Sequence, residues 1–221
     1  MSQVLSVNVG QAQPKPHRPN GVTGIGKRAV DHPVEVRPPG PKRGSGSGLA
    51  GDFIGNRKYH GGDDQAVYAV AREDLDRWSI RLERDLPNGF FGENLTTVGI
   101  DPNEARIGEV WRIGDTVELT VTHPRTPCAT FRGWVGERQW TKQFTADARP
   151  GAYFRVTVPG LIAPGDAIEV ISRPEHDVTI STVFLALTTE RHLLPSLVVA
   201  EPHLTDEVRE AVSAWLVRAA G

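Results

Sequence analysis

The only cysteine of the chain, Cys128, stands in the segment HPRTPCATF, directly behind an alternating apolar stretch at 117–122. Three cationic or proton-bearing residues surround it: His123, Arg125 and Arg132. Nearby positive charge lowers the pKa of a thiol, and the thiolate is the form that attacks electrophiles and binds metals. A single cysteine is otherwise a small buried apolar residue. The segment therefore predicts either a reactive thiolate or an inert thiol.

Pro124 and Pro127 stiffen the loop that carries this thiol. A rigidly held thiolate suits a soft metal such as molybdenum, copper or iron better than magnesium. One protein thiolate cannot complete most metal sites, and iron–sulfur clusters need several cysteines. Either a metal brings ligands of its own, or Cys128 works without metal as a nucleophile or sulfur carrier.

The segment KYHGGDDQAVY joins Lys58 and His60 to the glycine pair Gly61 and Gly62. Glycine allows backbone N–H groups to approach a ligand closely, so this segment predicts a local anion cradle that suits phosphate. The alternative is an ordinary glycine turn beside a solvated lysine. Neither P-loop nor dinucleotide-binding spacing is present.

A third segment, FGENLTT, places an acid and an amide before a β-prone stretch. The amide of Asn94 has donors and an acceptor, which suit either a bound heterocycle or the bracing of a neighbouring loop. For Glu93 we expect a structural salt bridge to Arg57, Lys58 or Arg125.

The composition limits the function classes. The chain has 221 residues, 38% of them hydrophobic and 24% charged, with a formal net charge of −2. A chain without net positive charge has no global field for holding a nucleic-acid polymer or an anionic membrane. The N-terminal residues MSQVLSVNVG lack the pattern of a secretion signal, and no long apolar run is present. We expect a cytoplasmic protein without membrane or nucleic-acid partners.

Glycine and proline divide the first three quarters of the chain into short β-prone runs, which predicts a β-rich (α+β) fold. Predicted strands cover 4–9, 34–36, 65–70, 109–113, 117–121, 153–158 and 168–171, with helices at 72–86 and 137–146 and a flexible surface loop at 38–48. Helical patterns follow at 178–187 and 192–200 and after Thr205. We predict a β-barrel domain at 1–173 and a small helical domain at 174–221. The helical part could form a homodimer contact or cover the site.

The three segments KYHGGDDQAVY, FGENLTT and PRTPC, in this order, resemble the MOSC domain, the C-terminal module of molybdenum cofactor sulfurases. The similarity is greatest to the YiiM-like branch, whose bacterial members are linked to resistance to 6-hydroxylaminopurine. It covers roughly residues 20–172, and the helical tail resembles the three-helix C-terminal domain of that branch.

The resemblance implies a MOSC-type β-barrel, a bound molybdenum cofactor and reduction of N-hydroxylated substrates such as 6-hydroxylaminopurine. It implies that Cys128 is both the metal ligand and the catalytic residue. The implied cofactor-facing residues are Lys58, His60, Gly61, Gly62, Asn94 and Arg125, the last two holding the pterin or its phosphate.

The same resemblance implies a separate reductase as electron donor, because the chain has a single cysteine and binds no iron–sulfur cluster. Sulfurase relatives carry an upstream pyridoxal-phosphate domain for which this chain has no room, so pyridoxal phosphate is a property of the wider family only. Two alternatives stay open. Cys128 could carry a persulfide, or its thiolate could hold the cofactor for transfer, without redox turnover; or the domain could be purely structural.

Overall fold

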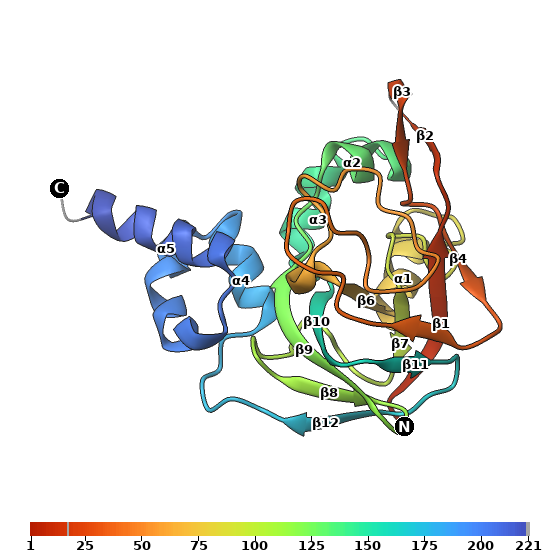
Figure 1. Ribbon diagram of the computed structural model, residues 1–221. Coiled ribbons are helices and arrows are strands. Elements are labelled where there is room, and N and C mark those ends of the chain that lie inside the picture. The colour runs from red at the N-terminus through yellow and green to blue at the C-terminus, as the bar shows by residue number, and fades with distance from the viewer. Residues whose placement is uncertain (17, 220–221) are drawn as a thin grey trace.

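The computed structural model describes residues 1–16 and 18–219, and its main element is a strongly curved sheet (Figure 1). The sheet has eight strands in the order β12-β8-β9-β10-β6-β7-β1-β4. Their bounds are β1 Gln3–Gly10, β4 Lys27–Val30, β6 Val67–Ala71, β7 Leu95–Val98, β8 Val110–Ile113, β9 Val117–Pro124, β10 Ala152–Val158 and β12 Ile168–Ser172. Neighbouring strands are antiparallel except β6 and β7, which are parallel.

The end strand β12 meets β1, the next-to-last strand at the other side of the sheet. The N–H of Val4 donates to the carbonyl of Asp166, and the N–H of Ile168 donates to the carbonyl of Ser2, at 2.8 and 2.9 Å. Gln3 and Ala167 form an antiparallel bridge between these two bonds. The start of β1 therefore pairs with the start of β12, and the sheet closes into the barrel that the sequence predicted.

Two short antiparallel pairs lie outside the main sheet. Strand β5 (Val34–Val36) pairs with β11 (Gly160–Ile162), and β2 (Gln13–Lys15) pairs with β3 (Arg18–Thr23). The β2–β3 hairpin projects beyond the end of the barrel beside the second helix, α2 (Figure 1). The apolar pattern did not predict this hairpin, because its sequence is short, polar and contains proline in both strands.

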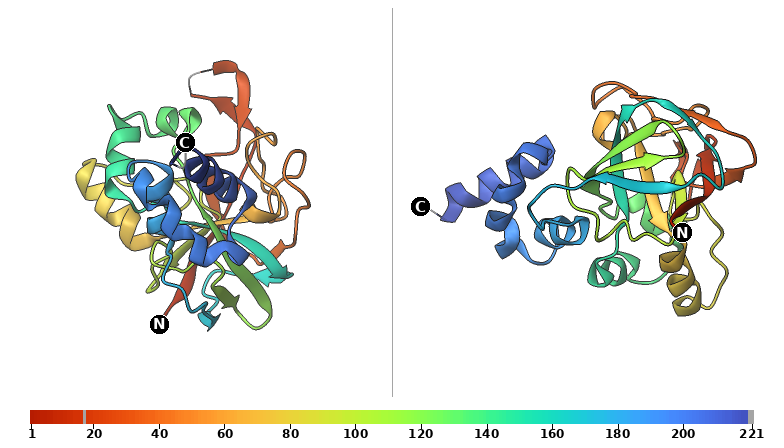
Figure 2. Two further views of the ribbon diagram at one scale, coloured as in Figure 1. Left: turned by 90° about the vertical axis from the view of Figure 1, so that its left-hand side faces the viewer. Right: turned by 90° about the horizontal axis from the view of Figure 1, so that it is seen from below.

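The helices cover the outside of the barrel and extend from it (Figures 1 and 2). They are η1 Asp63–Gln65, α1 Arg72–Arg81, α2 Ala129–Val135, α3 Trp140–Asp147, α4 Ile180–Leu187, η2 Arg191–His203 and α5 Asp206–Ala219. The α2 and α3 helices bury an aromatic cluster in which Phe131 contacts Trp140 and Phe144 at ring distances of 5.4 and 5.1 Å. This cluster fixes the position of α2, which carries the cysteine at its N-terminal end.

The predicted elements mostly agree with the structure. All seven predicted strands and all five predicted helical segments are present, with boundaries shifted by a few residues. The helix predicted at 72–86 ends at Arg81, because Glu83 adopts a left-handed conformation with φ of 51°. The segment predicted at 192–200 is a 3-10 helix, since Pro195 and Pro202 lack the N–H groups of a regular α-helix.

The loop predicted at 38–48 has no strand or helix, but it is well anchored. Its Gly40 carbonyl accepts from the N–H of Asp63, and its Gly46 carbonyl accepts from the N–H of Gly62. The flexible loop that composition predicted is therefore held against the KYHGGDD segment. Backbone hydrogen bonds, which cannot be deduced from composition, hold the loop in place.

The C-terminal helices extend to one side of the barrel (Figure 2). Buried apolar residues of α4, η2 and α5, among them Val183, Leu197 and Val208, belong to the same hydrophobic cluster as the barrel interior. The division into domains at residue 173 stays a prediction. Within the described residues, no helix combines the length and apolar character that crossing a membrane requires.

Candidate functional site

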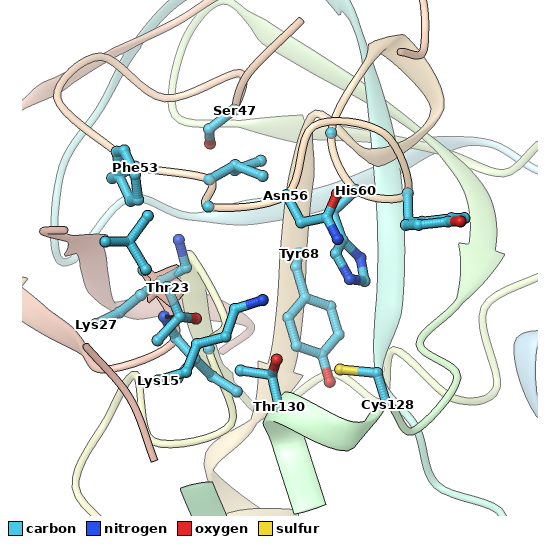
Figure 3. A pocket seen from close by; sticks show the side chains of 18 of the residues that line it. Lys15, Thr23, Lys27, Ser47, Phe53, Asn56, His60, Tyr68, Cys128 and Thr130 are labelled. Carbon is cyan, nitrogen blue, oxygen red and sulfur yellow. Dashed lines mark hydrogen bonds between the residues drawn. The ribbon is translucent and has the colours of Figure 1, made fainter. Parts of the chain in front are cut away.

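A cavity of about 570 Å³ opens at one end of the barrel, between the β2–β3 hairpin and α2 (Figure 3). This volume lies within the usual range for small-molecule and cofactor sites. Residues from the KYHGGDD segment, β6, the segment after β9 and the hairpin line it together. The predicted site residues among them are His60, Gly61, Asn94, Arg125 and Cys128. The fold therefore gathers five of the seven predicted site residues in one cavity.

Cys128 lies at the junction of the loop after β9 and α2. It is the N-cap residue of α2, and its sulfur accepts a hydrogen bond from the N–H of Phe131 at 3.4 Å. Figure 3 shows its side chain among the residues that line the cavity. The thiol is partly exposed, so a ligand in the cavity can reach it.

The surroundings of this thiol stabilise its charged form. Burial is the largest single effect and raises the pKa of Cys128, but a hydrogen bond from His60, the charge of Arg125 and the N–H of Phe131 together outweigh it. The result is a pKa of about 6. Cys128 is thus a thiolate at neutral pH, which agrees with the first of the two sequence interpretations.

Arg125 is buried beside the thiol without a carboxylate partner. Its side chain lies between two rings, with Cζ 5.2 Å from the centroid of Tyr68 and 4.5 Å from that of Phe131. One guanidinium nitrogen donates to the hydroxyl of Tyr153 at 3.2 Å, and Nε has no partner among the described residues. A buried guanidinium stays protonated. Its charge faces the Cys128 thiolate, and its Nε, which has no partner among the described residues, can donate to an anionic ligand.

The structure separates the four residues predicted from KYHGGDDQAVY into two groups. His60 and Gly61 line the cavity, whereas Lys58 and Gly62 are not among the residues that line it. The exposed side chain of Lys58 places its ammonium 5.3 Å from the ring centroid of Tyr59. The structure therefore does not bring Lys58 and Gly62 into the cavity with the other predicted site residues, and their contacts with a cofactor stay a prediction.

The role predicted for Gly62 needs correction, because its N–H is already used within the protein. It donates to the carbonyl of Gly46 at 3.2 Å. A Cβ at this residue would come within 2.7 Å of Cα of Lys42, and its φ is 84°. The glycine is required for close packing of the anchored loop, rather than for close approach of a ligand.

Asn94 lines the cavity, but its side chain braces the protein. Its amide donates to Asp52 at 2.9 Å, and its oxygen accepts from the N–H of Tyr68 at 3.2 Å. Of the two roles that the sequence left open, bracing is the one seen. The amide has no free N–H for the predicted contact with the pterin, because its second N–H faces the carbonyl of Asn8 at 3.4 Å.

The salt bridge expected for Glu93 is wrong. This fully buried carboxyl accepts from the N–H groups of Gly89 and Phe91 at 2.5 and 2.9 Å and from the hydroxyl of Thr96 at 3.0 Å. Burial raises its pKa, and these hydrogen bonds oppose the increase, which leaves the pKa at about 7. Glu93 therefore closes the turn that precedes β7, a role that pairing rules for exposed charges do not predict.

A buried ion pair in the cavity wall was missed at the sequence level. Lys27 bonds to Asp52, and the two side chains are 7% and 1% exposed. Burial lowers the pKa of Lys27, against the opposing effect of Asp52. Since Asp52 also accepts from Asn94, the pair extends the bracing network. The two residues are distant in sequence, and neither lies in a recognisable motif.

The donor set fits a metal that brings its own ligands. Within residues 1–16 and 18–219, no cluster of three or more His, Cys, Asp and Glu side chains is placed to hold a metal ion. The cavity instead combines one thiolate with a buried cation whose Nε has no partner among the described residues. This combination suits a cofactor that is anionic and coordinates its own metal.

Comparisons with known proteins identify the family. The model of the MOSC domain matches residues 56–169. The protein YflK of Bacillus subtilis (strain 168) is 32% identical over 178 residues, which cover 80% of this chain and 76% of YflK. A Gibberella moniliformis protein named "Reductase" is 32% identical over 138 residues, but these cover 61% of this chain and only 24% of the fungal protein.

A solved structure agrees with this result over nearly the whole chain, including the C-terminal helices. The crystal structure of YiiM from Geobacillus stearothermophilus has a TM-score of 0.76 and 25% sequence identity, and the match covers 97% of this chain and 98% of YiiM. The matched domain, the closed sheet and the cysteine-bearing cavity lead to one conclusion. The chain belongs to the MOSC domain family, in its YiiM-like branch.

Proposed function

We propose that this protein binds the molybdenum cofactor and reduces N-hydroxylated compounds, such as 6-hydroxylaminopurine, with electrons from a separate reductase. MOSC domains as a family are associated with this cofactor. The observation that carries the proposal is the pair formed by the Cys128 thiolate and the buried, carboxylate-free Arg125 in one cavity. A thiolate beside a buried cation favours an anionic ligand that accepts a sulfur donor.

Each residue of the pair has a distinct part in this proposal. Cys128 supplies the sulfur ligand, and Arg125 supplies a charge-assisted hydrogen bond from Nε to an anionic group of the cofactor. His60 and Gly61 form the wall beside them. Asn94 acts indirectly by keeping Asp52 and Tyr68 in place. Lys58 and Gly62 are given no direct contact.

When bound, the cofactor supplies the two electrons that break the N–O bond of the substrate. The amine and one water are formed, and two protons are consumed. The chain must deliver these protons beside Cys128, where His60 is the proton-bearing side chain that shares a hydrogen bond with the thiolate. The walls of the cavity would hold the substrate against the reacting centre.

Metal analysis tests the proposal directly. We would express the protein in cells that make the molybdenum cofactor and in cells that cannot, then measure molybdenum and released pterin per chain. Near-stoichiometric molybdenum from the competent cells alone, lost in Cys128→Ala, is expected. Turnover of 6-hydroxylaminopurine should require both the loaded protein and Cys128. A correctly folded protein without metal from either source contradicts cofactor binding.

A second candidate function rests on the same lowered thiol pKa. A partly exposed thiolate is suited to accept sulfane sulfur, so Cys128 could act as a sulfur or cofactor carrier without turnover. Mass spectrometry of the native protein distinguishes the two functions. A carrier shows the added mass of one sulfur atom, removable by a thiol reductant, and no reduction of hydroxylamines.

The remaining parts of the proposal concern partners and location. We propose a cytoplasmic protein that receives electrons from a separate reductase and has no nucleic-acid polymer or membrane as partner. A homodimer formed through the C-terminal helices is part of the same proposal. Size-exclusion chromatography with light scattering tests the oligomeric state, since removal of α5 should then yield a monomer.

A further inference from the structure

The charges that line the cavity are unbalanced. Five cationic side chains line it, Lys15, Arg18, Lys27, Arg125 and Arg132, whereas Asp52 is the only carboxylate among the lining residues that the structure describes. The whole chain, by contrast, has a formal net charge of −2. Because Asp52 is already paired with Lys27, the other four cations face the cavity without a carboxylate. A strongly anionic ligand is the natural counterpart.

These four cations lie in two different environments. Arg125 is 8% exposed and lies beside Cys128, at the end of the cavity that the proposed cofactor occupies. Arg18 and Arg132 are exposed and Lys15 is half-buried, so these three lie at the mouth. Among residues 1–16 and 18–219, none of the three forms an ion pair. The buried and the exposed cations can therefore serve two different anionic groups.

The β2–β3 hairpin holds Lys15 in a defined position. The side chain of Lys15 crosses Gly21 of β3, where an added Cβ would come within 2.9 Å of Cδ of Lys15. Figure 3 shows its amine directed into the cavity toward Tyr68, with Thr130 close by. Because the hairpin restricts the side chain of Lys15, this lysine loses less conformational entropy on binding than a freely moving surface lysine.

The cavity lining also offers an exposed aromatic ring. Tyr59 lines the same cavity and is 59% exposed, which is unusual for a large aromatic residue. An exposed ring of this kind can stack on a planar base. The cavity thus combines a cationic hairpin with an exposed aromatic ring. Together these features match a planar ring that carries a phosphate ester.

We infer that Lys15, Arg18 and Arg132 form a phosphate subsite at the cavity mouth, and that the substrate is an N-hydroxylated nucleoside monophosphate rather than the free base. This inference rests on the proposed reductase function for the identity of the substrate. The phosphate of the cofactor itself is the other possible source of the same chemistry. The experiment must therefore separate a substrate phosphate from a cofactor phosphate.

Equilibrium binding to the cofactor-loaded protein is the first measurement. Calorimetry should be run with AMP, adenosine and inorganic phosphate, using wild type and the double variant Lys15→Gln/Arg132→Gln. We expect AMP to bind at least tenfold more tightly than adenosine to wild type, and this preference to fall below threefold in the double variant. Lys142→Gln/Arg138→Gln is the matched control, because both residues are exposed and do not line the cavity. It should keep the full preference.

A second measurement identifies the source of the phosphate. Molybdenum per chain should be the same in wild type and in the double variant if the mouth cations serve the substrate. Loss of molybdenum from the double variant, or equal binding of AMP and adenosine by wild type, overturns the inference. Gly21→Ala is a milder test, since it displaces Lys15 without removing its charge, and it should lower the AMP preference with molybdenum content unchanged.

Turnover separates this inference from the function on which it rests. With reduced methyl viologen as electron donor, the loaded wild type should reduce 6-hydroxylaminopurine ribonucleoside monophosphate with a kcat/KM at least tenfold above that of the free base. If neither compound is reduced, the reductase proposal fails, while the AMP measurement still decides the subsite. If the free base is reduced as efficiently as the nucleotide, the phosphate inference fails and the reductase proposal stands.

Discussion

The backbone N–H of Phe131 donates a hydrogen bond to the sulfur of Cys128 at 3.4 Å. The ring of the same residue contacts the guanidinium of Arg125, 4.5 Å from Cζ to the ring centroid. Phe131 is fully buried in the aromatic cluster beneath α2 and α3, so its backbone and its ring are both fixed. The aromatic core thus positions a donor and a cation beside the thiol.

The reactivity of Cys128 should therefore follow an unusually low pKa. In cofactor-free protein, the rate of alkylation by iodoacetamide is expected to rise with pH and to reach half its maximum near pH 6, since the pKa of the thiol is about 6. Arg125→Gln and His60→Gln should each move this midpoint to higher pH, because each removes a group that stabilises the thiolate. Mass spectrometry of quenched samples measures the rate.

Arg138→Gln is the control for the alkylation series, because Arg138 is exposed and does not line the cavity. Its midpoint should equal that of wild type. A wild-type midpoint above pH 8 contradicts the electrostatic description of the site, and it removes the main support for a metal-binding thiolate.

Asn94→Ala should destabilise the fold rather than release the cofactor directly. The substitution removes the hydrogen bonds to Asp52 and to the N–H of Tyr68, and it leaves both groups buried. Leaving such groups unsatisfied costs on the order of 2–4 kcal/mol of unfolding free energy. Urea denaturation of the cofactor-free variant measures this loss.

Molybdenum content provides the contrasting readout for Asn94. A variant with wild-type stability and strongly reduced molybdenum per chain would show that the amide holds the cofactor, as the family resemblance implied. Thr97→Val is a suitable control at a buried residue of β7, the strand that follows Asn94, because its hydroxyl makes only a long contact of 3.5 Å to the carbonyl of Val70. It should cost clearly less stability than Asn94→Ala.

The sequence predicted a β-rich fold because its strands alternate or carry β-branched residues. The closed barrel followed mainly from the resemblance to the MOSC domain. The cavity residues Cys128, Arg125 and His60 were also predictable, since each lies in a short motif. The Lys27–Asp52 pair was not, because it joins residues that are distant in sequence and lie outside any motif. The hairpin that carries Lys15 and Arg18 was missed because its strands are short and contain proline.

Local motifs also led to wrong predictions for residues whose roles depend on contacts in the folded protein. The glycine pair in KYHGGDD was interpreted as a ligand cradle, but the N–H of Gly62 binds Gly46 within the protein. Glu93 was expected to form a salt bridge, yet it is fully buried against backbone donors. The partner of Gly62 lies in a segment that is distant in sequence, whereas the partners of Glu93 lie within four residues of it, in a turn whose backbone conformation the motif did not reveal.

Gly62→Ala should be strongly destabilising, because two independent costs combine at this residue. Its φ of 84° disfavours any residue with a side chain, and the added Cβ would come within 2.7 Å of the backbone of Lys42. Gly165→Ala is the matched control, since Gly165 has a φ of 93° and no atom within 4 Å of an added Cβ. The control isolates the conformational cost, about 1–2 kcal/mol.

Urea denaturation of the two glycine variants gives the comparison. Gly62→Ala should lose clearly more unfolding free energy than Gly165→Ala, and it should also increase proteolytic cleavage within the loop at 38–48. Equal losses in the two variants would mean that the loop moves away from residue 62 at no cost, which contradicts its anchoring.

His123 should make the fold sensitive to acid. It is 3% exposed, lies 4.0 Å from a carboxylate oxygen of Glu207 on α5, and faces Lys42 and Asp64 as well. Burial lowers the pKa of its imidazole to about 4, against the opposing charges of Glu207 and Asp64. The unfolded chain protonates this residue near its ordinary pKa of 6.5. Between these two values the unfolded state binds more protons than the folded state.

The free energy of unfolding should therefore decrease as the pH falls from 6.5 toward 4, and His123→Asn should flatten this part of the profile. Urea denaturation of the variant and of wild type at several pH values isolates the contribution of this one residue. The raised pKa of Glu93 changes the free energy of unfolding with pH in the opposite direction, and it does so equally in both proteins. His32→Asn is the control, because the His32 side chain is 66% exposed. Parallel profiles for wild type and His123→Asn would mean that His123 takes up its proton at the same pH in the folded and the unfolded protein, which contradicts the lowered pKa.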